Sequence, residues 1–126
     1  MRLLLDACVL YPTVLREILM GTAKNDLFTP LWSERILEEW ARAARKLGPT
    51  GEVQARGEIA LLRADWPDAV IIPRAGDTAR LWLPDPNDIH VLAAGIAGSA
   101  DKIVTFNAKD FPRQTLVEEG LDRIAP

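Results

Sequence analysis

Aspartate residues occupy two places in this sequence where a negative charge needs a physical reason. Asp6 stands inside "LLLDAC" with apolar residues on both sides, and a buried aspartate is costly unless it is paired, hydrogen-bonded or bound to a metal. Asp85 and Asp88 precede the apolar run of "LPDPNDIHVLAAGIAG". Asp85 suits the N-cap of a helix and Pro86 its first position, while Asp88 either serves the helix N-terminus or directs its charge at a ligand.

Two adjacent glutamates lie in a helix predicted over residues 34–47, with Ser33 as its N-cap. At about 100° per residue, the apolar side chains of this helix form one stripe. Glu39 falls roughly 100° from the centre of that stripe and Glu38 roughly 160° away. We therefore expect Glu38 in solvent. Glu39 lies at the border of the apolar face, where it can reach a cleft or pair with a basic residue one turn away.

A further group of oxygen-bearing side chains, Thr105, Asn107 and Asp110, follows a predicted strand in "TFNAKDFP". Turns favour the same residue types, so this segment alone has two interpretations. The single cysteine excludes an internal disulfide and any multi-cysteine metal site. A nucleophilic dyad of Cys8 and the single histidine, His90, is conceivable, but no sequence feature brings the two together.

Strands and helices alternate along the chain. Strands are expected over residues 2–10, 69–72 and 102–106, with extended segments at 27–32 and 122–126. Helices are expected at 12–25, 34–47 (ended by Gly48 and Pro49), 52–65, 88–98 and 113–120. This order predicts one α/β domain over residues 1–126 with a mostly parallel sheet. Ligands bind such sheets at the carboxyl ends of the strands, which is where Asp6 and the "TFNAKDF" segment should meet.

The composition is typical of a globular protein, with 48% hydrophobic and 26% charged residues. The opening apolar run is too short for a signal peptide, and nothing approaches the ~20 apolar residues of a membrane span, so we expect a cytoplasmic protein. The net charge of −3 argues weakly against a nucleic-acid partner. With four of the 18 acids assigned to a metal site, however, the remaining 14 nearly balance the 15 Lys and Arg residues.

Four carboxylates without matching histidines or cysteines favour a hard cation such as Mg²⁺ or Mn²⁺. Their order also resembles the PIN-domain family of metal-dependent ribonucleases, and within it the VapC-like toxins of type II toxin–antitoxin pairs. The resemblance covers nearly the whole chain. Its strongest segment is "DPNDIHVLAAGIAGSADKIVTFNAKDFP", and "LLLDACVLYP" and "SERILEEW" match the opening strand and the glutamate helix.

The resemblance implies a three-layer α/β/α domain that hydrolyses RNA phosphodiester bonds with Mg²⁺ or Mn²⁺. Carried over residue by residue, it assigns the catalytic and metal-binding acids to four positions and the supporting polar residues to three more. The acids are Asp6, Glu39, Asp88 and Asp110, and the supporting residues are Thr105, Asn107 and Asp85. A shifted alignment would place the glutamate at Glu38. A small antitoxin partner and a homodimer are implied as well, and relatives often continue beyond "LDRIAP".

Basic residues near these acids are candidate phosphate contacts, although a solvated helix face would have the same composition. They are Arg42, Arg45, Lys46 and Lys109. Two alternatives stay open. One is a PIN-like module that binds RNA or a partner without cutting. The other is an aspartyl-phosphate phosphatase built on Asp6, which would require a second acid two residues later, where this chain has Cys8.

Overall fold

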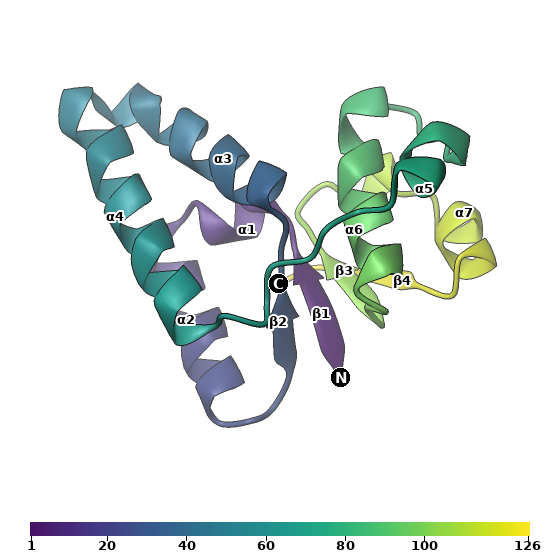
Figure 1. Cartoon of the computed structure of the whole chain (residues 1–126), viewed down its shortest axis with the longest axis horizontal. Coiled ribbons are helices and arrows are strands. Elements are labelled where there is room, and N and C mark those ends of the chain that lie inside the picture. Colours follow the sequence, from purple (N-terminus) through teal and green to yellow (C-terminus); the bar gives the residue numbers. More distant parts are fainter.

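A parallel four-stranded sheet forms the centre of the molecule in the computed structural model, which describes residues 1–126 (Figure 1). Its strands are β1 (Arg2–Leu5), β2 (Thr29–Leu31), β3 (Lys102–Val104) and β4 (Asp122–Ile124), in the order β2-β1-β3-β4. Every neighbouring pair is parallel. The α/β class with a parallel sheet is therefore confirmed.

Helices cover both sides of this sheet (Figure 1). On one side lie α1 (Ala7–Leu10), α2 (Thr13–Lys24), α3 (Glu34–Ala43) and α4 (Pro49–Asp65), and on the other α5 (Ala75–Arg80), α6 (Ile89–Ala97) and α7 (Arg113–Glu118). Short 3₁₀ turns occupy Ala44–Leu47, Pro86–Asp88 and Ala108–Asp110. The three-layer arrangement agrees with the expectation. None of these helices combines the length and apolarity that a membrane crossing requires.

The core is one cluster of buried apolar side chains on both faces of the sheet. Leu4 and Leu5 of β1 are fully buried, as expected for a central parallel strand covered on both faces. Trp32 and Trp40 are buried in the same cluster, whereas Trp82 is 68% exposed. Two of the four tryptophans are thus fully part of the core.

Several predicted boundaries were wrong. The strand predicted over residues 2–10 ends at Leu5, because the Asp6 carboxylate accepts the Ala7 N–H and caps the short helix α1. The segment 69–72 forms a single parallel bridge, between Val70 and Trp32. The strand predicted over 102–106 ends at Val104. Helix α4 begins at Pro49, three residues before the predicted start, and α5 was not predicted.

Candidate active site at the carboxyl edge of the sheet

The strands β1 and β3 are neighbours at the centre of the sheet, and the chain continues from their carboxyl ends toward opposite edges of the sheet. From β1 the chain goes to β2, and from β3 it goes to β4 on the other side. Such a switch point is the usual ligand site of an open parallel sheet. An open cleft of about 530 Å³ lies there. It is lined by Asp6, Ala7, Cys8, Tyr11, Glu39, Trp40, Ala43, Lys46, Asp88 and Asn107.

Asp6 is fixed at the floor of this cleft by hydrogen bonds on both carboxylate oxygens. Oδ1 accepts the Ala7 N–H at 2.8 Å and Oδ2 accepts the Thr105 hydroxyl at 2.9 Å. The residue is 7% exposed. Burial raises the pKa of this carboxyl above its ordinary value, against the effect of these hydrogen bonds, and the nearby charge of Glu39 raises it further. Asp6 is thus fixed in position by hydrogen bonds, while its burial disfavours the ionised form of the carboxyl.

Asp85 and Asp88 have separate tasks at the start of α6. The Asp85 side chain accepts the Asn87 N–H at 2.9 Å, so Asp85 is the N-cap of the 3₁₀ turn Pro86–Asp88 that leads into α6. The Asp88 side chain makes no capping bond and lines the cleft. Burial, followed by the charges of Asp6, Asp85 and Asp110, raises the pKa of Asp88 to about 6. Asp110 is half-buried near this group but does not itself line the cleft.

The two adjacent glutamates of α3 face different neighbours. Glu39 lines the cleft, and its Oε2 lies 3.2 Å from His90 Nε2. Glu38 turns to α4, where it accepts hydrogen bonds from Arg56 and from Arg42 of its own helix. Arg56 and then Arg42 lower the pKa of Glu38 to about 2. The geometry places Glu39, not Glu38, beside Asp6, although both side chains are about equally exposed.

The exit of β3 is tied to the exit of β1 by a small polar network. The Thr105 hydroxyl, besides donating to Asp6, accepts the Asn107 N–H at 3.0 Å. The Cys8 Sγ lies 3.5 Å from the Thr105 hydroxyl and accepts the Phe106 N–H at 3.4 Å. His90 contacts Glu39 instead, so the structure does not form a Cys8–His90 dyad.

One of the four candidate phosphate contacts, Lys46, lines the cleft. Arg42 pairs with Glu38 and Arg45 with Glu52, both outside the cleft lining. Lys109 is exposed next to Asp110. Sequence patterns did not point to Tyr11 and Ala43, which also line the cleft, because neither has a chemical type or spacing that signals a site.

The acids at this edge lack a counter-charge. No ion pair of the structure includes Asp6, Asp88 or Asp110, although arginines elsewhere pair with surface acids. Negatively charged oxygen donors without a basic partner fit a hard divalent cation. No group of three acids, histidines or cysteines stands close enough to bind one ion directly. Water would have to complete the coordination, as Mg²⁺ usually retains several waters.

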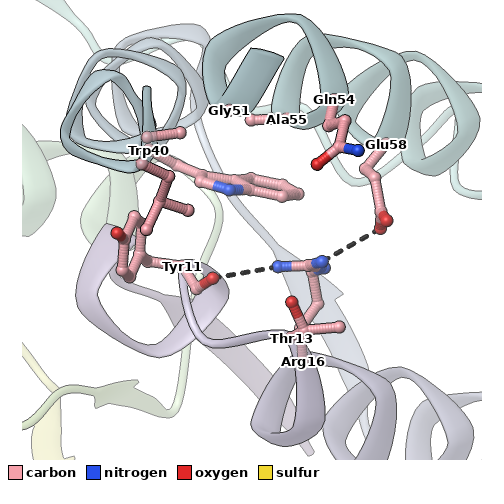
Figure 2. A pocket seen from close by; sticks show the side chains of 10 residues that line it. Tyr11, Thr13, Arg16, Trp40, Gly51, Gln54, Ala55 and Glu58 are labelled. Carbon is pink, nitrogen blue, oxygen red and sulfur yellow. Dashed lines mark hydrogen bonds and ion pairs between the residues drawn. The ribbon is translucent and has the colours of Figure 1, made fainter. Parts of the chain in front are cut away.

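A second, smaller cavity of about 80 Å³ adjoins the cleft and shares Tyr11 and Trp40 with it (Figure 2). Its central residue is the buried Arg16, which lies over the Trp40 ring at 4.5 Å from the centroid. The guanidinium donates to the carbonyl oxygens of Leu10 at 2.6 Å and Tyr11 at 3.2 Å, and to Glu58 at 3.0 Å. Arg16 thereby joins α1, α3 and α4 behind the cleft wall.

Comparison with known proteins agrees with this geometry. The PIN domain model matches residues 2–109. The solved structure of VapBC2 from Rickettsia felis, bound to a DNA fragment from their promoter, has a TM-score of 0.63 at 20% identity and covers 100% of this chain and 99% of that one. VapBC-1 from nontypeable Haemophilus influenzae has a TM-score of 0.64 at 18% identity, covering 99% and 98%. None of the curated proteins matches. The fold and the family match together show that this chain belongs to the PIN-domain family.

Proposed function

We propose that this chain is a Mg²⁺- or Mn²⁺-dependent endoribonuclease whose site is the carboxylate edge of the sheet. The observation that carries the proposal is the absence of any ion pair at Asp6, Asp88 and Asp110, combined with raised pKa values at the first two. Carboxylates that repel one another and have no basic partner gain most from a divalent cation. PIN-domain membership supports a nuclease in particular.

Each residue has a role that follows from its contacts. Asp6, Asp88 and Asp110 would hold the metal, directly or through water, and Glu39 would either join them or orient the attacking water. The bound ion would lower the pKa of that water and neutralise charge on the phosphate. Thr105 keeps the Asp6 carboxylate in place, and Asn107 adds a polar residue to the lining of the cleft.

An RNA strand is the substrate that we propose for the metal-loaded cleft. The cleft is open, and Lys46 is part of its lining, where it can neutralise a phosphate of the bound strand. Accessible phosphodiesters with freedom to bend occur in single-stranded and looped RNA.

A toxin role with an antitoxin partner is the biological setting we propose. The two solved structures compared above are VapBC assemblies by name, and the sequence resembles VapC-like toxins. The resemblance also implies a partner segment with a basic residue that blocks the site, for which the unpaired aspartates would be a suitable receptor. We propose a homodimer as well. Exposed apolar side chains such as Trp82 suit an interface.

Cleavage of a mixed set of labelled RNAs by purified protein, with Mg²⁺, Mn²⁺ or EDTA, tests the proposal. We expect the wild type to cut in the presence of metal and an identically purified Asp6→Asn variant to be at least about 100-fold slower. Equal cutting by both proteins would reveal a contaminating nuclease. If neither protein cuts although both bind RNA, the chain is a non-catalytic binding module. Release of phosphate from phosphomonoesters would favour the phosphatase alternative.

A further inference from the structure

His90 lies in a position that the catalytic roles above do not use. It is the second residue of α6, two positions after the cleft-lining Asp88, and its side chain is only 6% exposed. Its Nε2 lies 3.2 Å from the Glu39 carboxylate, which belongs to α3 in the opposite helical layer (Figure 1). This contact joins the two helical layers at the lining of the cleft.

The two ring nitrogens of His90 have different surroundings, and these define which one carries the proton. A carboxylate can only accept a hydrogen bond, so Nε2 must be the donor to Glu39. Nδ1 is buried and has no hydrogen-bond partner. A buried N–H without an acceptor is costly, and therefore the neutral ring with its proton on Nε2 fits this site.

The Glu39 carboxylate depends on the His90 hydrogen bond for its position, whereas the Asp6 carboxylate has two other donors. Its side chain is 41% exposed and has no other hydrogen bond from a side chain, whereas Asp6 is held by Ala7 and Thr105. A flexible glutamate loses rotamer freedom whenever it is fixed against a ligand. A buried ring, itself fixed by packing, can hold the carboxylate in position beforehand.

We infer that His90 is a positioning residue for Glu39, whose Nε2–H holds the Glu39 carboxylate at the cleft wall beside Asp6, ready to act on a bound divalent cation or its water. The inference rests on the proposed function of the cleft. Partners that orient ligands in this manner commonly change metal affinity by about 10-fold or more when removed.

Because His90 is the single histidine of the chain, its protonation can be read without assignment ambiguity. Long-range ¹H–¹⁵N correlation spectra of the metal-free protein, at mildly alkaline pH, should show a protonated Nε2 and a bare Nδ1. The pattern should shift in Glu39→Ala. A proton on Nδ1, or a spectrum unaffected by Glu39→Ala, would overturn the inference whether or not the protein cuts RNA.

Mn²⁺ affinity, measured without RNA by electron paramagnetic resonance, tests the consequence. We expect His90→Leu, which keeps the volume but lacks a donor, to weaken binding about 10-fold. His90→Gln, whose amide can donate from a similar reach, should stay within about 3-fold of the wild type. Val91→Ala, a truncation of a buried side chain in the same helical turn, controls for general destabilisation and should leave the affinity unchanged while lowering Tm.

The result that overturns the inference is a folded His90→Leu protein with wild-type Mn²⁺ affinity. Equal losses in His90→Leu and Val91→Ala would also overturn it, since the effect would then be one of packing. In the Glu39→Ala background His90→Leu should cause no further loss. Failure of the proposed function is distinguishable, because it would appear as a wild type whose Mn²⁺ binding is absent or insensitive to Asp6→Asn.

Discussion

At the scale of single residues, the main feature is charge that nothing in the chain neutralises. Asp88 is half-buried, lines the cleft and lies near three other aspartates, and these conditions raise its pKa to about 6. Acids on the surface of α3 and α4 show the opposite behaviour, because arginines hold Glu38 and Glu52 in their ionised form. The ionised carboxylate is thus stabilised by arginines on the helix surface and is destabilised in the cleft, where a ligand is expected.

Replacement of Asp88 by asparagine should stabilise the metal-free protein. The folded protein binds the proton of Asp88 more tightly than the unfolded chain, so stability is lost as the pH rises through the interval from about 4 to about 6. Solvent screening at this half-exposed group limits the gain from Asp88→Asn to roughly 1 kcal/mol, or about 4 °C in Tm. Thermal unfolding in EDTA at neutral pH and near pH 4 measures it. The hypothesis would be refuted if Asp88→Asn were no more stable than the wild type at neutral pH, or if its gain in Tm were the same at both pH values.

The Cys8 thiol should be dispensable for RNA cleavage. It contacts Asp6, Thr105 and the Phe106 N–H but not His90, so no imidazole is in place to take its proton, and a carboxylate is a weak base for a thiol. Burial also raises the pKa of this thiol, which disfavours the reactive thiolate. We expect Cys8→Ser to retain activity within about 3-fold, measured as single-turnover cleavage. A loss comparable with that of Asp6→Asn would revive a nucleophilic mechanism.

At the scale of elements, one buried arginine connects the helices behind the cleft. Arg16 of α2 satisfies the carbonyl oxygens that end α1, covers Trp40 of α3 and pairs with Glu58 of α4 (Figure 2). Trp40 neighbours Glu39 in sequence. The position of the glutamate helix therefore depends on this arginine as well as on apolar packing.

Arg16→Met should destabilise the fold by roughly 2–3 kcal/mol, since it leaves the Leu10 and Tyr11 carbonyls without their donor. Glu58→Gln should cost below about 1 kcal/mol, because Glu58 is half-exposed. Urea denaturation of both variants checks the difference. Equal effects would mean that the ion pair, rather than the carbonyl contacts, is what Arg16 contributes.

Two glycines of α4 provide a matched pair for testing how closely this helix packs. A Cβ at Gly51 would lie 2.4 Å from the Ala44 carbonyl oxygen, whereas a Cβ at Gly57 would meet nothing within 4 Å. Gly51→Ala should therefore destabilise the protein by about 2 kcal/mol, and Gly57→Ala should stabilise it by roughly 0.5–1 kcal/mol through helix propensity. Denaturation midpoints of the two variants should move in opposite directions, and a stabilising Gly51→Ala would disprove the close approach.

Much of the architecture could be predicted because its signals are local. The alternation of strands and helices implied a parallel sheet, and the ends of parallel strands share an edge, so Asp6 and Thr105 were expected together. The strand after Leu5 was extended too far because the pattern of apolar residues continues while the Asp6 side chain already caps α1. Helix α5 was not predicted, because its sequence "AGDTAR" is short and lacks apolar residues at helical spacing.

The contact of Glu39 with His90 had no sequence signal. The two residues are 51 positions apart and belong to helices in opposite layers. Whether they meet depends on how α3 and α6 approach the sheet edge, which is a property of the packed core. Helical periodicity could still separate Glu39 from Glu38, because that distinction depends on one helix alone.

At the scale of the whole molecule, the net charge of −3 conceals an uneven distribution. Arginines on α3 and α4 are largely matched by acids on the same surface, while the carboxyl edge of the sheet concentrates unpaired aspartates. A cation in the cleft would bring the molecule closer to neutrality. Such a molecule can accept a polyanion at an edge that repels it when metal-free, and we therefore expect RNA binding at the cleft to be strengthened by metal.

The most direct measurement is the anomalous diffraction of a crystal soaked in Mn²⁺. We predict a Mn²⁺ peak inside the cleft, between Asp6 and Asp88, that disappears in crystals of Asp6→Asn. A peak confined to the surface acids, or an empty cleft at saturating Mn²⁺, would contradict the claim that this carboxylate edge is a metal-dependent catalytic site.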